Sequence, residues 1–192
     1  MKLHKIYKQI LGEGFSMKID PSCDCCKYFD FTFSQAGGYF AGLLHPVYYA
    51  INKNETHTLT YITPEQYIRI ISKGFGLTYQ EAIDSGAVNK ETVLKYAKAM
   101  KSGEKFPIGW YRVNSSSQEG RHRALAAMEL GCKSIPVVVF RDIDYEEKMQ
   151  IVKHHMNFSR EELNNLYKEN GYNGITDLDW RELNGFISRN NL

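Results

Sequence analysis

A glycine followed by three basic residues, at the start of an alanine-rich segment, constrains this chain more than any other stretch. Residues 119–127 read Glu-Gly-Arg-His-Arg-Ala-Leu-Ala-Ala, and residues 135–140 read Ile-Pro-Val-Val-Val-Phe. Gly120 has no Cβ, so the backbone can approach another group closely there. Alanine and leucine favour a helix after this glycine, and the valine run favours a strand that is covered on both faces. The pattern therefore predicts a glycine turn, a helix and a buried strand.

The first turn of this helix is predicted to bind phosphate. Its backbone N–H groups have no partner inside the helix, and the helix dipole adds partial positive charge. Cations at that end oppose the dipole at roughly 0.3–1 kcal/mol each, so a run of them indicates that an anion is bound. We therefore predict that Gly120, Arg121, His122 and Arg123 bind phosphate, with Ser117 of the preceding polar turn. The alternative is that both arginines are solvated residues of an ordinary amphipathic helix.

His122 has two interpretations. Its unperturbed pKa lies near 6.5, so a bound phosphate would favour protonation of the ring. Phosphate binding would then weaken as the pH rises from about 6 to 8. In the alternative, His122 is a neutral histidine packed under the turn.

The segment Glu-Gly-Arg-His-Arg-Ala at 119–124, together with Ile135-Pro136-Val137, resembles the signature of the ParB/sulfiredoxin superfamily. In that group a Gly-x-x-Arg or Gly-x-His-Arg turn opens a helix and binds nucleotide phosphates, and a strand with Ile-Pro-Val follows. The resemblance is specific over residues 101–140 and extends back to about residue 58. It implies a mixed α/β (α+β) fold in which a small mixed sheet is flanked by helices.

Within the superfamily, the residues around the turn distinguish the activities. Sulfiredoxins carry a catalytic cysteine directly before the His-Arg pair, where this chain has Arg121, so sulfinate reduction is not expected. Free-serine kinases have an acidic residue before the turn glycine, as Glu119 is here, and such a carboxylate holds Mg²⁺ or acts as a general base. The alternative for Glu119 is a structural ion pair with Arg123. Chromosome-partitioning members bind CTP through Gly-Glu-Arg-Arg, whereas this chain has Gly-Arg-His-Arg.

The resemblance leaves three functions open. The first is a Mg²⁺-dependent NTPase or phosphotransferase that binds ATP or CTP at Gly120–Arg123, with Glu119 as catalytic residue and metal ligand. Glu65 and Glu91, each near a predicted helix start, are candidates for a second acidic ligand. The second is a ParB-like nuclease acting on DNA, a label that many phage and plasmid proteins with this signature carry. The third is a non-catalytic module that binds nucleotide or DNA.

The chain is expected to divide into an N-terminal extension (1–56), a ParB/sulfiredoxin-like domain (57–142) and a helical C-terminal appendage (143–192). We interpret the appendage as a packing element, because its glutamates would repel a phosphate backbone, and the alternative is a helix-turn-helix that reads DNA. Cap, turn and periodicity signals predict the elements. Strands are expected at 28–33, 45–50, 58–62, 108–113 and 135–140, and helices at 5–11, 64–73, 79–85, 90–102, 121–130 and 178–188. Capping boxes at Asp144 and Ser159 predict two further helices, the second of which ends before Gly171.

Composition and cysteine content place only broad limits on the protein. Its 192 residues are 43% hydrophobic and 24% charged, which is typical of a globular chain, and a net charge of +2 neither requires nor forbids nucleic acid. No signal-peptide pattern or bilayer-length apolar run is visible, so we expect a cytoplasmic protein without membrane contact. Cys23, Cys25, Cys26 and Cys132 are expected to be reduced thiols without function, the alternative being a metal or redox role. Nothing indicates the oligomeric state.

Overall fold

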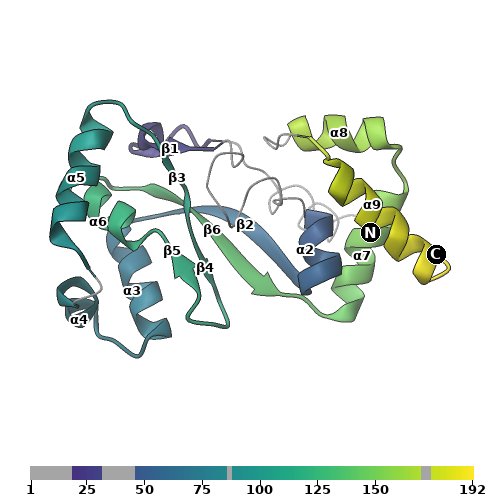
Figure 1. Ribbon diagram of the computed structural model, residues 1–192, viewed down its shortest axis with the longest axis horizontal. Coiled ribbons are helices and arrows are strands. Elements are labelled where there is room, and N and C mark those ends of the chain that lie inside the picture. Colours follow the sequence, from purple (N-terminus) through teal and green to yellow (C-terminus); the bar gives the residue numbers. More distant parts are fainter. Residues whose placement is uncertain (1–18, 32–45, 86–87, 170–173) are drawn as a thin grey trace. The chain divides into compact units, whose positions relative to one another are not determined.

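The computed structural model describes residues 19–31, 46–85, 88–169 and 174–192 (Figure 1). Within these residues the chain forms eight α-helices, a four-stranded mixed sheet and a two-stranded sheet. The α+β class that the sequence predicts is therefore confirmed. In the described part of the chain, every helix is too short or too polar to cross a membrane.

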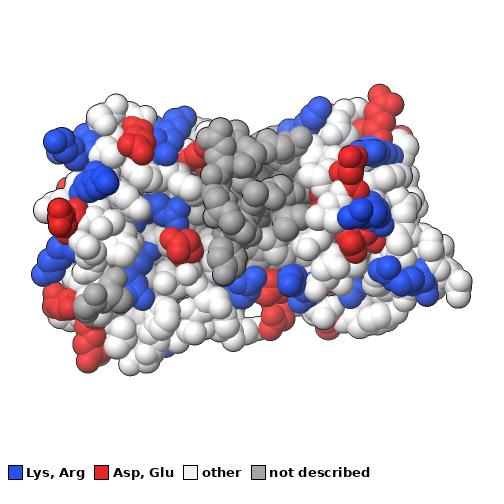
Figure 2. Space-filling model, in the orientation of Figure 1, with Lys and Arg blue, Asp and Glu red and all other residues white. Residues whose placement is uncertain are grey.

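The chain is divided into two compact units. In the described part of the chain, the first unit holds residues 46–58, 141–169 and 174–192, and the second holds residues 19–31, 59–85 and 88–140. The second unit thus takes in residues 19–31 as well as most of the segment 57–142, over which the ParB/sulfiredoxin-like domain is predicted. On the face that Figure 2 shows, basic and acidic side chains are interspersed, in keeping with the small net charge.

The four-stranded sheet has the strand order β2-β6-β4-β5. Its strands are β2 (Glu55–Ile62), β4 (Gly109–Arg112), β5 (Gln118–Glu119) and β6 (Ile135–Asp142). Strand β4 is parallel to β6, with Trp110 opposite Val138, and antiparallel to β5, with Trp110 opposite Glu119. Strand β6 has a neighbour on each side, and Val137, Val138 and Phe140 are at most 1% exposed. The prediction of a strand covered on both faces is thus confirmed.

Helices of the second unit begin where the sequence predicts. They are α3 (Pro64–Gly74), α4 (Tyr79–Asp84), α5 (Lys90–Lys101) and α6 (Arg121–Glu129). The side chains of Thr63, Thr78 and Asn89 each accept a hydrogen bond from the third backbone N–H of the helix that follows. These bonds satisfy donors that the helix itself leaves free. Helix α6 packs against α3 and α5, which places its first turn beside their ends (Figure 1).

The expectation that the cysteines are reduced is wrong, because disulfides join Cys23 to Cys26 and Cys25 to Cys132. The Asp24 carboxylate accepts hydrogen bonds from the backbone N–H groups of Lys133 and Ser134, at 3.0 and 2.9 Å. These bonds hold the cysteine segment against the end of α6, although 107 residues separate Cys25 from Cys132. Cys23 and Cys26 are three positions apart, which is a Cys-x-x-Cys spacing.

The cysteine segment continues into short elements. They are the 3₁₀ helix η2 (Cys26–Tyr28), strand β1 (Phe29–Asp30) and its parallel partner β3 (Phe106–Pro107). The strand expected over 28–33 is therefore observed in part, and residues 32 and 33 lie outside the described residues. The helix expected at 5–11 also lies outside them.

The first unit contains α2 (Pro46–Lys53), α7 (Tyr145–Met156), α8 (Arg160–Glu169) and α9 (Asp177–Arg189). The three C-terminal helices are confirmed. The strand expected at 45–50 is wrong, because residues 46–50 belong to helix α2. Proline suits the first position of a helix, and Val47, Ala50 and Ile51 are buried at helical spacing. Helix α2 packs against α7 and α9, so its apolar face is covered by elements about 100 residues further along the chain.

Candidate phosphate-binding site

The turn before α6 is held by a close approach of two glycine backbones. Gly120 has φ of 121°, and a Cβ on it would lie 2.8 Å from the Cα of Gly109. Tyr67, which is fully buried, donates a hydrogen bond from its hydroxyl to the carbonyl of Glu119 at 2.8 Å. Burial raises the pKa of Tyr67 above its ordinary value, so the phenol stays protonated and remains a donor. These contacts fix where the first turn of α6 begins.

Arg121 is a buried cation without an acceptor among the described residues. Arg121 is only 9% exposed, and its Nε is buried without a hydrogen-bond partner among the described residues. The guanidinium lies over the ring of Phe75, 5.1 Å from the ring centroid, and in the described part of the chain it forms no ion pair. A buried charge without a counter-charge is destabilising by several kcal/mol, by rough estimate. A buried cation without a counter-charge is the arrangement expected of a residue that binds an anionic ligand.

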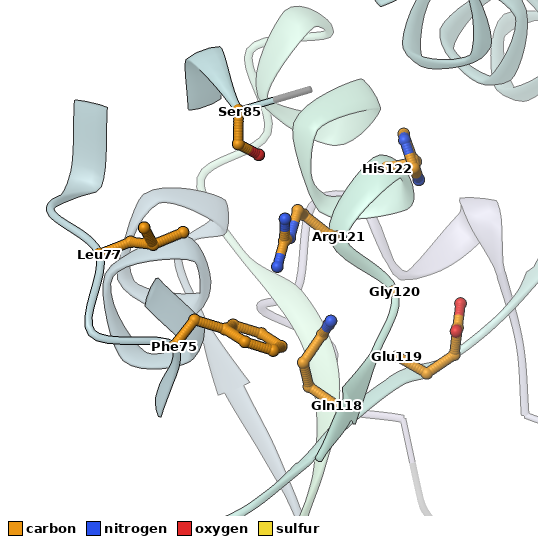
Figure 3. Close-up of a pocket in the computed structure, with 8 residues that line it drawn as sticks. All are labelled: Phe75, Leu77, Ser85, Gln118, Glu119, Gly120, Arg121 and His122. Atoms are coloured by element: carbon orange, nitrogen blue, oxygen red, sulfur yellow. The ribbon is translucent and has the colours of Figure 1, made fainter. Parts of the chain in front are cut away.

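The side chain of Arg121 lines a pocket of about 570 Å³, which we call the Arg121 pocket (Figure 3). Figure 3 shows the side chains of Arg121 and Gln118 pointing toward one another, with the Phe75 ring beside them. The Ser85 hydroxyl faces the same space from the end of α4. The described lining residues are Phe75, Leu77, Ser85, Gln118, Glu119, Gly120, Arg121 and His122.

Arg123 is engaged by the protein itself. Its Nη1 donates to the carbonyl of Pro107 at 2.8 Å, and its Nη2 donates to Oε1 of Glu119 at 2.9 Å. The Arg123 side chain is 10% exposed and the Glu119 side chain is 66% exposed, so the ion pair reaches from the interior to solvent. This geometry corresponds to the structural alternative for Glu119. The two arginines of the turn thus differ, because Arg123 ties the turn to β3 and β5 while Arg121 faces the pocket.

His122 also makes a contact within the protein. Its Nε2 accepts a hydrogen bond from the backbone N–H of Asn89 at 3.0 Å. An acceptor nitrogen carries no proton, so this bond requires the neutral ring with its hydrogen on Nδ1. The contact joins the N-cap of α5 to the first turn of α6. The arrangement therefore favours the interpretation of a neutral, packed histidine over that of a protonated phosphate ligand.

The remaining predicted site residues are dispersed. Ser117 lines a neighbouring pocket of about 430 Å³, which we call the serine pocket, and it does not line the Arg121 pocket. Glu65 is paired with Arg69 on α3 at 2.7 Å, and Glu91 lies in the first turn of α5. In the part of the chain that the structure describes, no group of three or more His, Cys, Asp or Glu side chains could hold a metal ion. One oxygen of the Glu119 carboxylate, Oε1, binds Arg123, and a role of Glu119 in holding Mg²⁺ stays a prediction.

Several residues of the pocket were not predicted from the sequence. Phe75, Leu77 and Ser85 come from the segment between α3 and α5, more than 30 residues before the motif. One signal in the sequence pointed to this pocket. Phe75 is a large aromatic residue directly after the glycine that ends α3, and it falls outside the apolar pattern of that helix. Tyr67 and Gly109 were assigned only to a helix and a strand, although they support the turn.

Comparisons of the chain with protein-family models, with curated proteins and with solved structures found no match. The resemblance to the ParB/sulfiredoxin superfamily thus rests on residues 119–124 and 135–137. The functions that it implies stay predictions.

Proposed function

We propose that this protein binds a nucleotide, with a phosphate group at the first turn of α6. The observation that carries the proposal is the buried guanidinium of Arg121, which faces a pocket without an acceptor among the described residues. A phosphate would supply both the counter-charge and the hydrogen-bond acceptors. The first-turn N–H groups after Gly120, which has no side chain to cap them, would donate to the same phosphate.

The chemistry of the pocket favours a nucleotide over inorganic phosphate. Its volume of about 570 Å³ exceeds what one phosphate fills and lies in the usual range for small-molecule sites. Phe75, which is 44% exposed, and Leu77 form an apolar wall on which a base or sugar can pack. Gln118 and Ser85 offer directional hydrogen bonds. ATP and CTP both satisfy this description.

We propose binding, and not turnover, as the function of the site. Glu119 is the acidic side chain that lines the pocket, and its carboxylate stabilises the turn through Arg123. Because Arg123 binds one oxygen of this carboxylate, we assign Glu119 a structural role. Mg²⁺-dependent phosphotransfer or nucleotide hydrolysis and DNA cleavage by a ParB-like nuclease remain the alternatives, and product analysis tests them.

The finer fold assignment and the location are also proposals. The glycine turn, the helix and the buried β6 strand support a ParB/sulfiredoxin-like arrangement of the second unit. A cytoplasmic location conflicts with the two disulfides, since such bonds persist mainly in oxidising compartments.

The proposal is tested by calorimetry with ATP, CTP and GTP, with and without Mg²⁺, on the parent and an Arg121→Met variant. Methionine keeps much of the side-chain volume and removes the charge. We expect Arg121→Met to bind at least about tenfold more weakly, the scale of a charged hydrogen bond, with an equal or higher melting temperature. Arg181→Met, at an exposed arginine of α9, is the matched control and should bind like the parent. Absence of binding by the parent, or equal affinity of Arg121→Met, would refute the proposal.

A further inference from the structure

The serine pocket adjoins the Arg121 pocket. Gln118 lines both pockets, and the chain passes directly from Gly74 in one to Phe75 in the other. A Cβ on Gly74 would lie 3.3 Å from the Cα of Ser116, so the end of α3 closely approaches the loop between β4 and β5. The two pockets are therefore neighbouring parts of one surface of the second unit.

Basic side chains lie in both pockets of this surface. Lys73 and Arg112 line the serine pocket, and its described lining includes no acidic side chain. Lys73 is exposed and, within the described residues, forms no ion pair. The Arg112 guanidinium lies over the rings of Trp110 and Phe140, 5.2 Å from each centroid, and these rings orient it. Arg121 in one pocket and Lys73 in the other suit a partner that carries more than one anionic group.

Apolar side chains are exposed beside these cations. Of the seven large hydrophobic residues that are exposed in the described part of the chain, three line the two pockets. They are Ile70 at 37%, Phe75 at 44% and Val113 at 57% exposure. Phosphate alone would leave them in water, whereas bases and sugars would cover them. The partner must therefore alternate anionic groups with flat, weakly polar ones.

We infer that the Arg121 pocket and the serine pocket form one groove for a single-stranded nucleic acid. One phosphate binds Arg121, and the adjoining nucleotide lies in the serine pocket, where Lys73 binds its phosphate. Single strands expose their bases to protein side chains, whereas a duplex buries them in its stack. The inference rests on the proposed phosphate site at Arg121, and it extends the ligand from one nucleotide to a strand.

The test is fluorescence anisotropy with labelled thymidine oligonucleotides of one, two, four and eight nucleotides. We expect the affinity to rise at least about tenfold from the mononucleotide to the tetranucleotide, because a second nucleotide then contacts the protein. Lys73→Gln should weaken tetranucleotide binding about three- to tenfold, flatten its salt dependence and leave mononucleotide affinity unchanged. Lys98→Gln, at an exposed lysine of α5, is the matched control and should behave like the parent.

The outcomes separate this inference from the proposed function. If the mononucleotide binds and longer strands gain nothing, or Lys73→Gln has no effect, the groove is refuted while the phosphate site stands. If a duplex of the same length binds more tightly than the single strand, the groove is also refuted. If neither the mononucleotide nor any strand binds, both proposals fail. A uridine tetranucleotide that binds as well as the thymidine one supports the groove and shows that it accepts RNA and DNA alike.

Discussion

Gly109 occupies the space that a side chain on Gly120 would need, since a Cβ on Gly120 would lie 2.8 Å from the Gly109 Cα. The clash would be with backbone, which cannot rotate away as a side chain can. Gly120 also has φ of 121°, a conformation that residues with a Cβ rarely adopt. The start of α6 therefore depends on glycine at this position for two independent reasons.

We predict that Gly120→Ala lowers the free energy of unfolding by about 2–4 kcal/mol, the sum of backbone strain and overpacking, and abolishes nucleotide binding. Gly103→Ala is the matched control, because Gly103 has φ of 94° but nothing within 4 Å of its Cβ position. It should lose only the strain energy, about 1–2 kcal/mol, and keep its nucleotide affinity. Denaturant titration of both variants gives the comparison. Equal losses would show that the approach of Gly109 contributes nothing.

The ion pair between Arg123 and Glu119 is predicted to be structural. Arg123→Gln should lower the free energy of unfolding by about 2–3 kcal/mol, because it also removes the buried bond to the Pro107 carbonyl. Glu119→Gln should cost only about 0.5–1 kcal/mol, because its side chain is 66% exposed and solvent screens the pair. A double-mutant cycle measures the coupling. An unchanged melting temperature in Glu119→Gln, with a loss of about 10²-fold or more in nucleotide hydrolysis, would instead identify Glu119 as catalytic.

The two disulfides should differ in their contribution to stability. The Cys25–Cys132 bond closes a loop of 107 residues and the Cys23–Cys26 bond spans 3, so the first restricts the unfolded chain far more. We expect the double variant Cys25→Ser/Cys132→Ser to lose about 2–5 kcal/mol of unfolding free energy, and Cys23→Ser/Cys26→Ser about 1–2 kcal/mol. With a reductant, the parent and both variants should converge. A parent whose melting temperature does not respond to reductant would contradict the prediction.

His155 and Asp179, two buried groups of the first unit, are predicted to have opposite effects on the free energy of unfolding in acid. Burial lowers the pKa of His155 to about 4, so folding excludes a proton and stability rises from about pH 4 to 6.5. Burial raises the pKa of Asp179 to about 6, against the effect of its bonds to Thr176, so folding retains a proton and stability falls from about pH 4 to 6. The parent should therefore change little across this range.

Replacing one of the two groups should reveal the other. In Asp179→Asn the titration of His155, together with that of the adjacent His154 whose pKa burial also lowers, is no longer opposed by Asp179. The free energy of unfolding should then rise by about 2–3 kcal/mol between pH 4 and 6.5. Trp180 lies in α9 and Trp110 in β4, so a Trp110→Phe background makes the fluorescence signal specific for the first unit. A flat profile for Asp179→Asn would show that His155 does not titrate in this way.

Local sequence chemistry predicted most of the second unit. Capping residues such as Thr63 and Thr78 act on N–H groups only three residues away, so their effect can be read from the chain alone. The unbroken valine run of β6 likewise indicates burial on both faces. Helix α2 was missed because His45–Ala50 is short, and periodicity does not separate a strand from a helix over six residues. Its helical form is stabilised by packing against α7 and α9, which lie far along the chain.

For the candidate site, the sequence by itself determined that a glycine turn with basic residues starts a helix, because turn geometry and helix ends depend on neighbouring residues. Only the tertiary structure decided that Arg121 faces a pocket while Arg123 is bound to Pro107 and Glu119. The two arginines are two positions apart on one helix, so they point in different directions and meet different elements. The disulfide partner of Cys25 also depends on the tertiary structure. The neighbouring Asp24 accepts a hydrogen bond from the backbone N–H of Lys133, more than 100 residues further along the chain. Contacts between distant segments depend on how the whole chain packs, and no local pattern records them.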